Sequence, residues 1–411
     1  MPDQPRNTYK RRTLLQTASL VTAGLALTPL GSRASENETL DFANGTRELL
    51  AYPQKRPLMR ITARPPHLET PFSVFNESIL TPNDAFFVRY HLANIPTSID
   101  PDTYQLQIKG LVDTPLSLSL AELKALAPAV EVVAVNQCSG NSRGFGLPRV
   151  FGAQLGNGSM GNARWTGIPL KTVLKRAGVQ AAGKQVTFRG LDQPVLPTTP
   201  QFIKSLAIDL ALSDEPMIAW AMNGTDIPLL NGYPIKLIVP GYAGTYWVKH
   251  LSEIEVIDHT FEGFFMANAY RVPDNDCQCV PGGSVADKTR PIGQLKVRSF
   301  ITSLQAGDRV KLGQPLTLEG IAFDGGHGIR SVEVSDDGGR RWHPAQLGED
   351  LGRYSYRQWT LAWRPRHLGK VGLQVRATSN NGEQQPRTLQ WNPAIYLKND
   401  IESTPVTVVQ E

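Results

Sequence analysis

The residue best suited to chemistry is Cys138, which lies in the stretch Asn-Gln-Cys-Ser-Gly-Asn-Ser-Arg at positions 136–143. It follows the apolar run 132–135 and precedes small, turn-forming residues, so we expect the thiol at the end of a strand. A thiolate binds metal or acts as a nucleophile only when deprotonated, and the cation of Arg143 would favour that state. A buried structural thiol is the alternative, because free cysteine is among the most buried residue types.

The turn around Cys138 resembles the active-site loop of the sulfite oxidase family of molybdenum enzymes, where a Cys-x-Gly-Asn-x-Arg loop gives the metal its protein ligand. Four further stretches resemble the family in the same order: Phe-Phe-Val-Arg-Tyr-His (86–91), Gly-Asn-Ala-Arg-Trp-Thr-Gly-Ile-Pro-Leu (161–170), Ala-Met-Asn-Gly (221–224), and Val-Pro-Gly (239–241) followed by Val-Lys (248–249). Each motif is weak alone, and five in order are specific. Within the family, the chain is similar to the catalytic molybdenum subunit of bacterial sulfite dehydrogenases, which pass electrons to cytochrome c.

The resemblance implies a molybdenum ion held by molybdopterin, a cofactor that moves an oxygen atom from water to a substrate lone pair. It makes Cys138 the thiolate ligand of the metal. Arg89 and Arg143 match the family's sulfite-binding arginines, and a guanidinium group can bind two oxygens of an oxyanion at once. Tyr270 matches the active-site tyrosine, whose phenol can assist proton movement. Without the resemblance, Arg89 would be interpreted as a surface arginine and Tyr270 as a core tyrosine.

The same resemblance implies how the pterin phosphate is bound, because the family uses scattered polar and basic side chains for this purpose. The matching cofactor-binding residues are His91, Asp192, Asn231, Lys236 and Lys249, in addition to Cys138. Asn231 stands where the vertebrate enzymes have histidine, so a phosphate contact there would be neutral. Taken alone, His91 would be interpreted as an ordinary core or surface histidine.

Two positions depart from the family pattern. The pocket tryptophan of the family aligns with Leu155, and the arginine of the vertebrate Trp-Asn-x-Arg motif aligns with Ala394 or Ile395. Both family residues help to form the vertebrate sulfite pocket. Their absence weakens the prediction that sulfite is the substrate, and it does not affect the prediction of a molybdenum site.

The N-terminus has the pattern of an export signal. Arg11 and Arg12 form a twin-arginine pair before the apolar run 14–30. This run includes several polar residues and is shorter than the ~20 residues that span a bilayer, although an uncleaved anchor is the alternative. The sequence predicts a twin-arginine signal peptide over residues 1–34, a periplasmic protein, and no stable membrane span after cleavage.

The charge of the chain resides mostly in this leader. The whole sequence has 42 basic and 37 acidic residues, of which five and one fall within positions 1–34, so the net charge drops from +5 to +1 without them. No stripe of lysine and arginine with interleaved aromatic residues remains. Nucleic acid is therefore not expected as a partner.

Three cysteines are too few for a disulfide framework. Cys277 and Cys279 are expected to be two loop thiols, with a disulfide between them or a metal contact as alternatives. The chain has no Cys-x-x-Cys-His motif for c-type haem and no iron–sulfur cysteine set, so no haem is expected in this chain. Electrons from a redox reaction would have to leave to another protein, for which the resemblance implies a c-type cytochrome.

The pattern of apolar residues predicts an α+β fold followed by a β-sandwich. Residues 35–84 are rich in proline and predict an extended wrap. Strands are expected at 104–108, 130–135, 185–189 and 235–239, and helices at 119–126 and 170–177. Beyond residue 296, short alternating runs at 316–321, 329–334, 359–363 and 372–378, with turns at 336–339 and 380–382, are typical of a sandwich.

We therefore predict a sulfite-oxidase-type molybdopterin-binding domain over residues 35–295 and an immunoglobulin-like domain over 296–411. The resemblance implies that the second domain serves dimerisation, in a homodimer or in a complex with a cytochrome subunit. The implied activity is the oxidation of sulfite, or a similar small oxyanion, with electrons passed singly to a c-type cytochrome. The alternatives are a periplasmic molybdenum reductase acting, for example, on a sulfoxide, and a non-catalytic exported binding protein.

Overall fold

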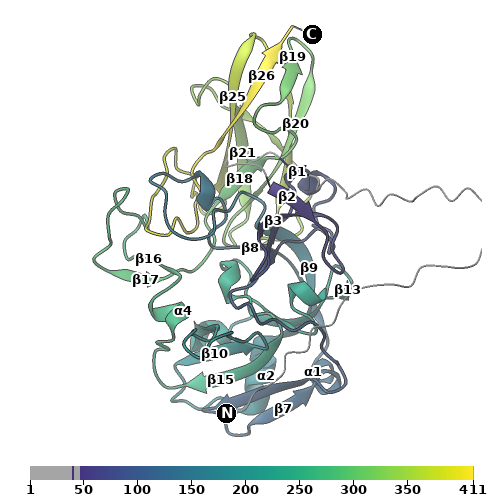
Figure 1. Ribbon diagram of the computed structural model, residues 1–411, viewed down its shortest axis with the longest axis vertical. Helices are drawn as coiled ribbons and strands as arrows, with labels where there is room; N and C mark the ends of the chain where they lie inside the picture. Colours follow the sequence, from purple (N-terminus) through teal and green to yellow (C-terminus); the bar gives the residue numbers. More distant parts are fainter. Residues whose placement is uncertain (1–38, 41–46, 411) are drawn as a thin grey trace, which may run out of the picture. The chain divides into compact units, whose positions relative to one another are not determined.

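The computed structural model describes residues 39–40 and 47–410 (Figure 1). The predicted signal peptide, residues 1–34, lies outside the described residues. Within the described ranges, no helix combines the length and the apolar character needed to cross a bilayer.

The segment 35–84 differs from its prediction, because its described part forms a sheet rather than an extended wrap. The strand order is β1-β2-β3-β4-β5. These strands are β1 (Thr39–Leu40), β2 (Arg47–Leu50), β3 (Leu58–Thr62), β4 (His67–Glu69) and β5 (Val88–Arg89), and the 3-10 helix η1 (Phe72–Asn76) follows β4. Leu58, Leu68 and Val88 are buried together in a small cluster, and the prolines fall between the strands. Tertiary burial thus stabilises strands that are too short to show a period in the sequence.

A second sheet has the order β11-β10-β15-β6-β7, with one parallel pair, β15 on β6. Its strands are β6 (Gln105–Gly110), β7 (Leu116–Ser119), β10 (Gln185–Gly190), β11 (Ile203–Ala207) and β15 (Leu251–Ile257). Helix α1 (Leu120–Ala125) begins at Ser119, which forms a reciprocal capping box with Glu122. Helix α2 (Leu170–Ala177) ends at Gly178, whose φ of +73° suits glycine. The predicted strands and helices here are confirmed.

The third sheet carries Cys138. Its order is β13-β12-β9-β8, with β14 paired to β12. Its strands are β8 (Val130–Gln137), β9 (Met160–Pro169), β12 (Met217–Met222), β13 (Thr225–Asp226) and β14 (Lys236–Ile238). Strands β8 and β9 pair antiparallel from Val130↔Gly167 to Gln137↔Met160. The chain between them, residues 138–159, therefore leaves and re-enters the sheet at one edge, and Cys138 is the first residue beyond β8.

Short elements complete this part of the fold. They are η2 (Arg143–Phe145), α3 (Ile208–Ala211), η3 (Leu229–Asn231), η4 (Gly244–Tyr246), α4 (Phe264–Ala267), β16 (Arg271–Pro273) and β17 (Thr289–Pro291). Cys277 and Cys279, between β16 and β17, form a disulfide, so the expectation of two free loop thiols is wrong. The intervening Gln278 has a φ of +54°, a backbone bend that sequence spacing does not reveal.

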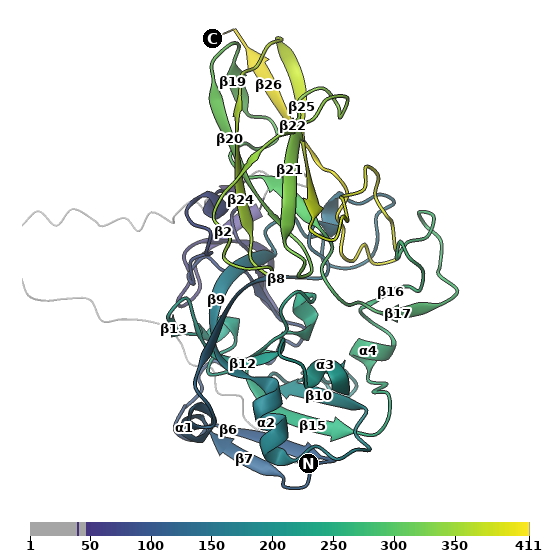
Figure 2. The same cartoon turned by 180° about the vertical axis from the view of Figure 1, so that it is seen from behind.

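The C-terminal strands form a sandwich of two sheets (Figure 2). One sheet contains β18 (Arg298–Ile301), β20 (Leu316–Phe323), β24 (Arg357–Trp363) and β23 (Gln346–Leu347); the other contains β19 (Arg309–Lys311), β26 (Ser403–Val409), β25 (Gly369–Ser379), β21 (Ile329–Ser335) and β22 (His343–Pro344). Leu318 and Trp359 of the first sheet share a buried cluster with Leu373 of the second. This confirms the predicted α+β fold followed by a β-sandwich.

The sandwich is also joined to the rest of the described unit. Phe300 and Tyr356 belong to the same buried cluster as Phe75 of η1. The Asn76 amide donates a hydrogen bond of 2.9 Å to the carbonyl of Thr302. The predicted domain limits at 34/35 and 295/296 stay predictions.

Candidate active site

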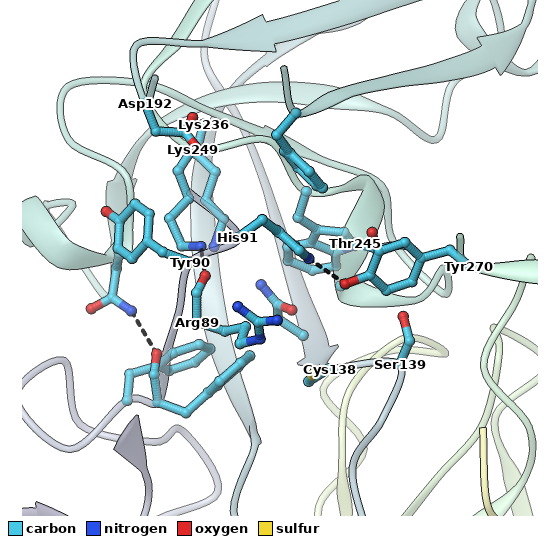
Figure 3. Close-up of a pocket in the computed structure, with 17 residues that line it drawn as sticks. Arg89, Tyr90, His91, Cys138, Ser139, Asp192, Lys236, Thr245, Lys249 and Tyr270 are labelled. Carbon is cyan, nitrogen blue, oxygen red and sulfur yellow. Dashed lines mark hydrogen bonds between the residues drawn. The ribbon is translucent and has the colours of Figure 1, made fainter. Parts of the chain in front are cut away.

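A cavity lies beside the end of β8, next to Cys138 (Figure 3). Eight of the nine predicted site residues line it, and Arg143 does not. The lining residues are Phe86, Phe87, Arg89, Tyr90, His91, Asn136, Cys138, Ser139, Asp192, Phe202, Asn231, Lys236, Gly244, Thr245, Trp247, Lys249 and Tyr270. Residues from seven separated parts of the sequence, at 86–91, 136–139, 192, 202, 231–236, 244–249 and 270, thus meet at one place.

Cys138 occupies one end of the cavity. Its backbone N–H donates to the carbonyl of Ser159 at 2.9 Å, and its carbonyl accepts from the backbone N–H of Asn141 at the same distance. These two bonds hold the turn that presents the thiol beyond β8. Among the described residues Cys138 is the free cysteine, and it is half-buried. The thiol is therefore accessible from the cavity and fixed by its backbone.

Arg143 lies beside the cavity rather than in its wall. Its Nε donates to the carbonyl of Ala394 at 2.7 Å, and its guanidinium lies 5.2 Å from the ring centroid of Tyr396. The structure therefore separates the two predicted substrate arginines: Arg89 faces the cavity and Arg143 is bound to a C-terminal segment. Sequence reasoning aligned Ala394 or Ile395 with a pocket arginine of the family but did not reveal the contact with Arg143, which lies 251 residues away.

His91 and Tyr270 form a hydrogen-bonded pair in the cavity wall, between Nε2 and the phenol oxygen. Burial, followed by the positive charges of Arg89 and Lys249, holds the pKa of His91 well below its usual range. Burial raises the pKa of Tyr270 although Arg89 opposes the shift. At neutral pH the imidazole is thus uncharged and the phenol keeps its proton, and the tautomer of His91 sets which of the two groups donates.

Two lysines line the opposite end of the cavity. Lys236 is buried between the rings of Trp165 and Trp247, at 4.8 and 5.6 Å from their centroids. Lys249 donates from Nζ to the carbonyl of Arg89. Burial lowers the pKa of Lys249 to about 8, against the opposing effect of Asp192. Asp192, the one carboxylate in the lining, has a pKa raised by burial. An anion at this end would relieve the burial cost of the lysines.

Lys55 forms hydrogen bonds with residues that line this end of the cavity, and it was not among the site residues predicted from the sequence. Its Nζ donates to the Asn231 side-chain oxygen at 2.5 Å and to the carbonyl of Phe86 at 3.0 Å. The Asn231 amide in turn donates to the carbonyl of Phe87 at 3.0 Å. Burial lowers the pKa of Lys55 to about 7. Lys55 was missed because it lies in the segment predicted as a wrap, where no motif marks it.

His67 is a second residue missed by sequence reasoning. It is buried on β4, where it pairs in register with Arg89 of β5. Its Nε2 hydrogen-bonds with the hydroxyl of Ser159 at 2.9 Å. Burial, then Arg89, lowers its pKa well below the usual range. A neutral His67 therefore links the strand that carries Arg89 to the loop after Cys138.

The residues present fit a phosphorylated pterin that carries a metal. Three polar atoms of lining residues are buried without a hydrogen-bond partner: Asn136 Oδ1, Ser139 Oγ and Thr245 Oγ1. Any Cβ at Gly244 would lie 2.4 Å from Asn136 Oδ1, so a glycine keeps this wall open. Among the described residues, no three or more His, Cys, Asp and Glu side chains are grouped as a metal site. A metal here would take Cys138 as its protein ligand and its other ligands from the cofactor.

The structure also shows where the two positions that depart from the family pattern, Leu155 and Ala394, lie. Leu155 is buried and absent from the cavity lining, so it does not replace the tryptophan as a pocket wall. Ala394 contributes its carbonyl to Arg143 instead of a charged side chain to the site. The cavity keeps its positive charge through Arg89 and the lysines.

Comparison with known proteins agrees with this arrangement. Residues 91–265 match the oxidoreductase molybdopterin binding domain, and residues 289–401 match the Mo-co oxidoreductase dimerisation domain. Sulfite oxidase of Gallus gallus is 33% identical over 83% of this chain and 76% of its own length; the mitochondrial sulfite oxidase of Rattus norvegicus is 32% identical over 87% and 67%. The crystal structure of the sulfane dehydrogenase SoxCD from Paracoccus pantotrophus has a TM-score of 0.70 and 25% identity, covering 85% of this chain and 88% of that one.

The cofactor is thereby assigned as molybdenum with molybdopterin, and the enzyme class as an oxidoreductase acting on a sulfur group. The match to the dimerisation domain supports a homodimer. The chain belongs to the sulfite oxidase family of molybdopterin oxidoreductases.

Proposed function

We propose that this protein oxidises sulfite to sulfate and passes the electrons one at a time to an external c-type cytochrome in the periplasm. The observation that carries the proposal is the cavity itself, which combines the thiol of Cys138, the guanidinium of Arg89 and the Tyr270–His91 pair. The sulfite oxidases to which the chain is similar support sulfite as the substrate.

The cofactor would be held at both ends of the cavity. Cys138 would bind the metal, while Lys236 and Lys249 would neutralise the phosphate and the unpartnered oxygens of Ser139 and Thr245 would bind polar groups of the pterin. When bound, the cofactor supplies oxygen-atom transfer and accepts the two electrons. The balance is sulfite plus water giving sulfate, two protons and two electrons.

The chain itself orients the substrate and moves the protons. Arg89 faces the cavity as a fixed cation and would hold the oxyanion through charge-assisted hydrogen bonds. The phenol of Tyr270, whose raised pKa keeps it protonated, would hold one proton near the reacting atoms, and its hydrogen bond with His91 Nε2 would fix the position of the phenol. Phe202 stacks on His91 with ring centroids 3.9 Å apart and restricts the imidazole.

The proposed export route and the proposed electron acceptor are inferred from the sequence. The twin-arginine pair Arg11-Arg12 supports export of a folded, cofactor-loaded protein. The absence of haem and iron–sulfur motifs from the sequence supports a separate electron carrier. The contact with the carrier would be small and transient. Such contacts are often steered by charge, so the rate of cytochrome c reduction should fall as the salt concentration rises.

The test is sulfite-dependent reduction of cytochrome c under anaerobic conditions with the purified, molybdenum-loaded protein. We expect two cytochromes reduced for each sulfite consumed. Turnover supported by dioxygen or a nicotinamide cofactor, and by neither cytochrome c nor an artificial one-electron acceptor, would refute the dehydrogenase assignment. Sulfoxide reduction with a reduced dye, in a protein that does not oxidise sulfite, would establish the reductase alternative.

A further inference from the structure

The C-terminal segment 391–397 lies against the active site through Tyr396. The ring of Tyr396 stacks on the ring of Tyr270, with centroids 5.3 Å apart and planes 19° from parallel. The guanidinium of Arg143 lies 5.2 Å from the centroid of the same ring. Tyr396 is thus in contact with two predicted site residues, Tyr270 and Arg143, and it joins them in one stack.

The backbone around Tyr396 is held in an unfavourable shape. Ile395 and Leu397, on either side of it, have φ values of +45° and +56°. This region is rare for non-glycine residues and most unusual for a β-branched one, so the surrounding structure must impose it. Tyr270 is also left-handed, with a φ of +59°. Strain of this kind at Tyr270 and at both neighbours of Tyr396 indicates that the position of the two rings is imposed by the surrounding structure.

Hydrogen bonds within the turn and from the thiol loop fix its position. The buried Asn392 side chain accepts from the backbone N–H of Tyr396 at 2.9 Å. The backbone N–H of Leu397 donates to the carbonyl of Ser139, next to Cys138, at 2.8 Å. The carbonyl of Ala394 accepts from Arg143. The first bond shapes the turn, and the other two set it relative to the thiol loop.

We infer that Tyr396 is a positioning residue for substrate binding, which sets the orientation of Tyr270 and of the Arg143 guanidinium at the edge of the cavity. The dimerisation domain match extends to residue 401, so a residue of that region completes the active site. This inference rests on the proposed function for its kinetic readout. It has an independent readout in the binding of an oxyanion.

The experiment compares Tyr396→Leu, which removes the aromatic face, with Tyr396→Phe, which keeps it. We expect Tyr396→Leu to raise KM for sulfite about three- to thirty-fold, the range of a lost cation–π contact and aromatic stack, with molybdenum content unchanged. Tyr396→Phe should restore KM to within about two-fold of the wild type. The control is Tyr354→Leu, the same change at a half-buried tyrosine under Arg353, which lies outside the cavity lining.

Sulfate is the second probe, measured by titration calorimetry on the loaded protein. Its dissociation constant should increase in Tyr396→Leu by a similar factor and remain unchanged in Tyr396→Phe and Tyr354→Leu. Equal values in Tyr396→Leu and the wild type would overturn the inference. So would equal losses in Tyr396→Leu and Tyr354→Leu, which would indicate a general effect on stability. A wild type that binds sulfate but does not oxidise sulfite would refute the proposed function alone.

Discussion

Replacing Arg89 with methionine is the most direct test of how the cavity binds its substrate. The side chain lines the cavity, and its own backbone carbonyl, which accepts from Lys249, is unaffected by the change. A lost charge-assisted hydrogen bond typically costs ~1.5 to 3 kcal/mol, which corresponds to about a ten- to hundred-and-fifty-fold rise in KM. We expect this rise in Arg89→Met with full molybdenum content.

The pH dependence of the same variant has a definite sign. Arg89 is one of the charges that lower the pKa of His91, after the larger effect of burial. Without it, the pKa of His91 rises, so the imidazole takes up a proton more readily as the pH falls. A protonated His91 would restore part of the lost positive charge. The KM penalty of Arg89→Met should therefore be smaller at low pH than at high pH.

The assay is steady-state sulfite oxidation with an artificial one-electron acceptor, over about pH 5 to 9, with rates expressed per bound molybdenum. Arg89→Lys keeps the charge and loses the planar fork, so its KM should lie between those of the wild type and Arg89→Met. Arg366→Met, at an exposed position, serves as the control. An Arg89→Met protein with normal molybdenum content and an unchanged KM would remove Arg89 from the substrate pocket.

Three further outcomes are expected. Cys138→Ser should abolish turnover without changing the thermal unfolding midpoint, because a hydroxyl is nearly isosteric but a poor metal ligand; normal turnover would exclude Cys138 as the ligand. Lys249→Met should lower the molybdenum retained after gel filtration about ten-fold. Retention by the wild type should weaken above about pH 8, where Lys249 loses its proton. Equal retention by Lys249→Met and the wild type would contradict a phosphate contact. Burial raises the pKa of Glu402, but the charges of Lys398 and Arg298 lower it by more, from 4.5 to about 2. The ionised carboxylate therefore contributes about 3 kcal/mol to the free energy of unfolding above pH 4.5, and this contribution is lost as the pH falls through 2. Urea unfolding of Glu402→Gln should lack this contribution at pH 7, and a stability equal to the wild type there would contradict it.

The turn that presents Cys138 was predictable because its signals are local. A buried apolar run forms β8, and small residues follow it directly, so both the strand and the turn can be inferred from neighbouring positions. The capping box at Ser119 and the left-handed Gly178 are equally local. The same reasoning fails for β3 and β4, whose strands are short and are stabilised by contacts with Val88 and Tyr90 further along the chain.

The disulfide illustrates the limit of spacing as a guide. Two cysteines separated by one residue can bond only if the backbone between them bends, and the left-handed conformation of Gln278 provides that bend. Glutamine has no special preference for this conformation. The sequence therefore left the thiols, the disulfide and the metal contact as alternatives.

The sequence by itself determined the identity of the chemical groups: a lone thiol in a strand-end turn, arginines, a histidine and a tyrosine in motifs that occur in a fixed order, and alternating strands after residue 296. Only the tertiary structure decided which of these groups face the same cavity. It placed Arg89 in the wall, bound Arg143 to Ala394, and brought Lys55 and Tyr396 to the site. The physical reason is that these contacts join residues more than 120 positions apart, and their stability comes from burial and charge, which depend on all the surrounding side chains rather than on neighbours in the sequence.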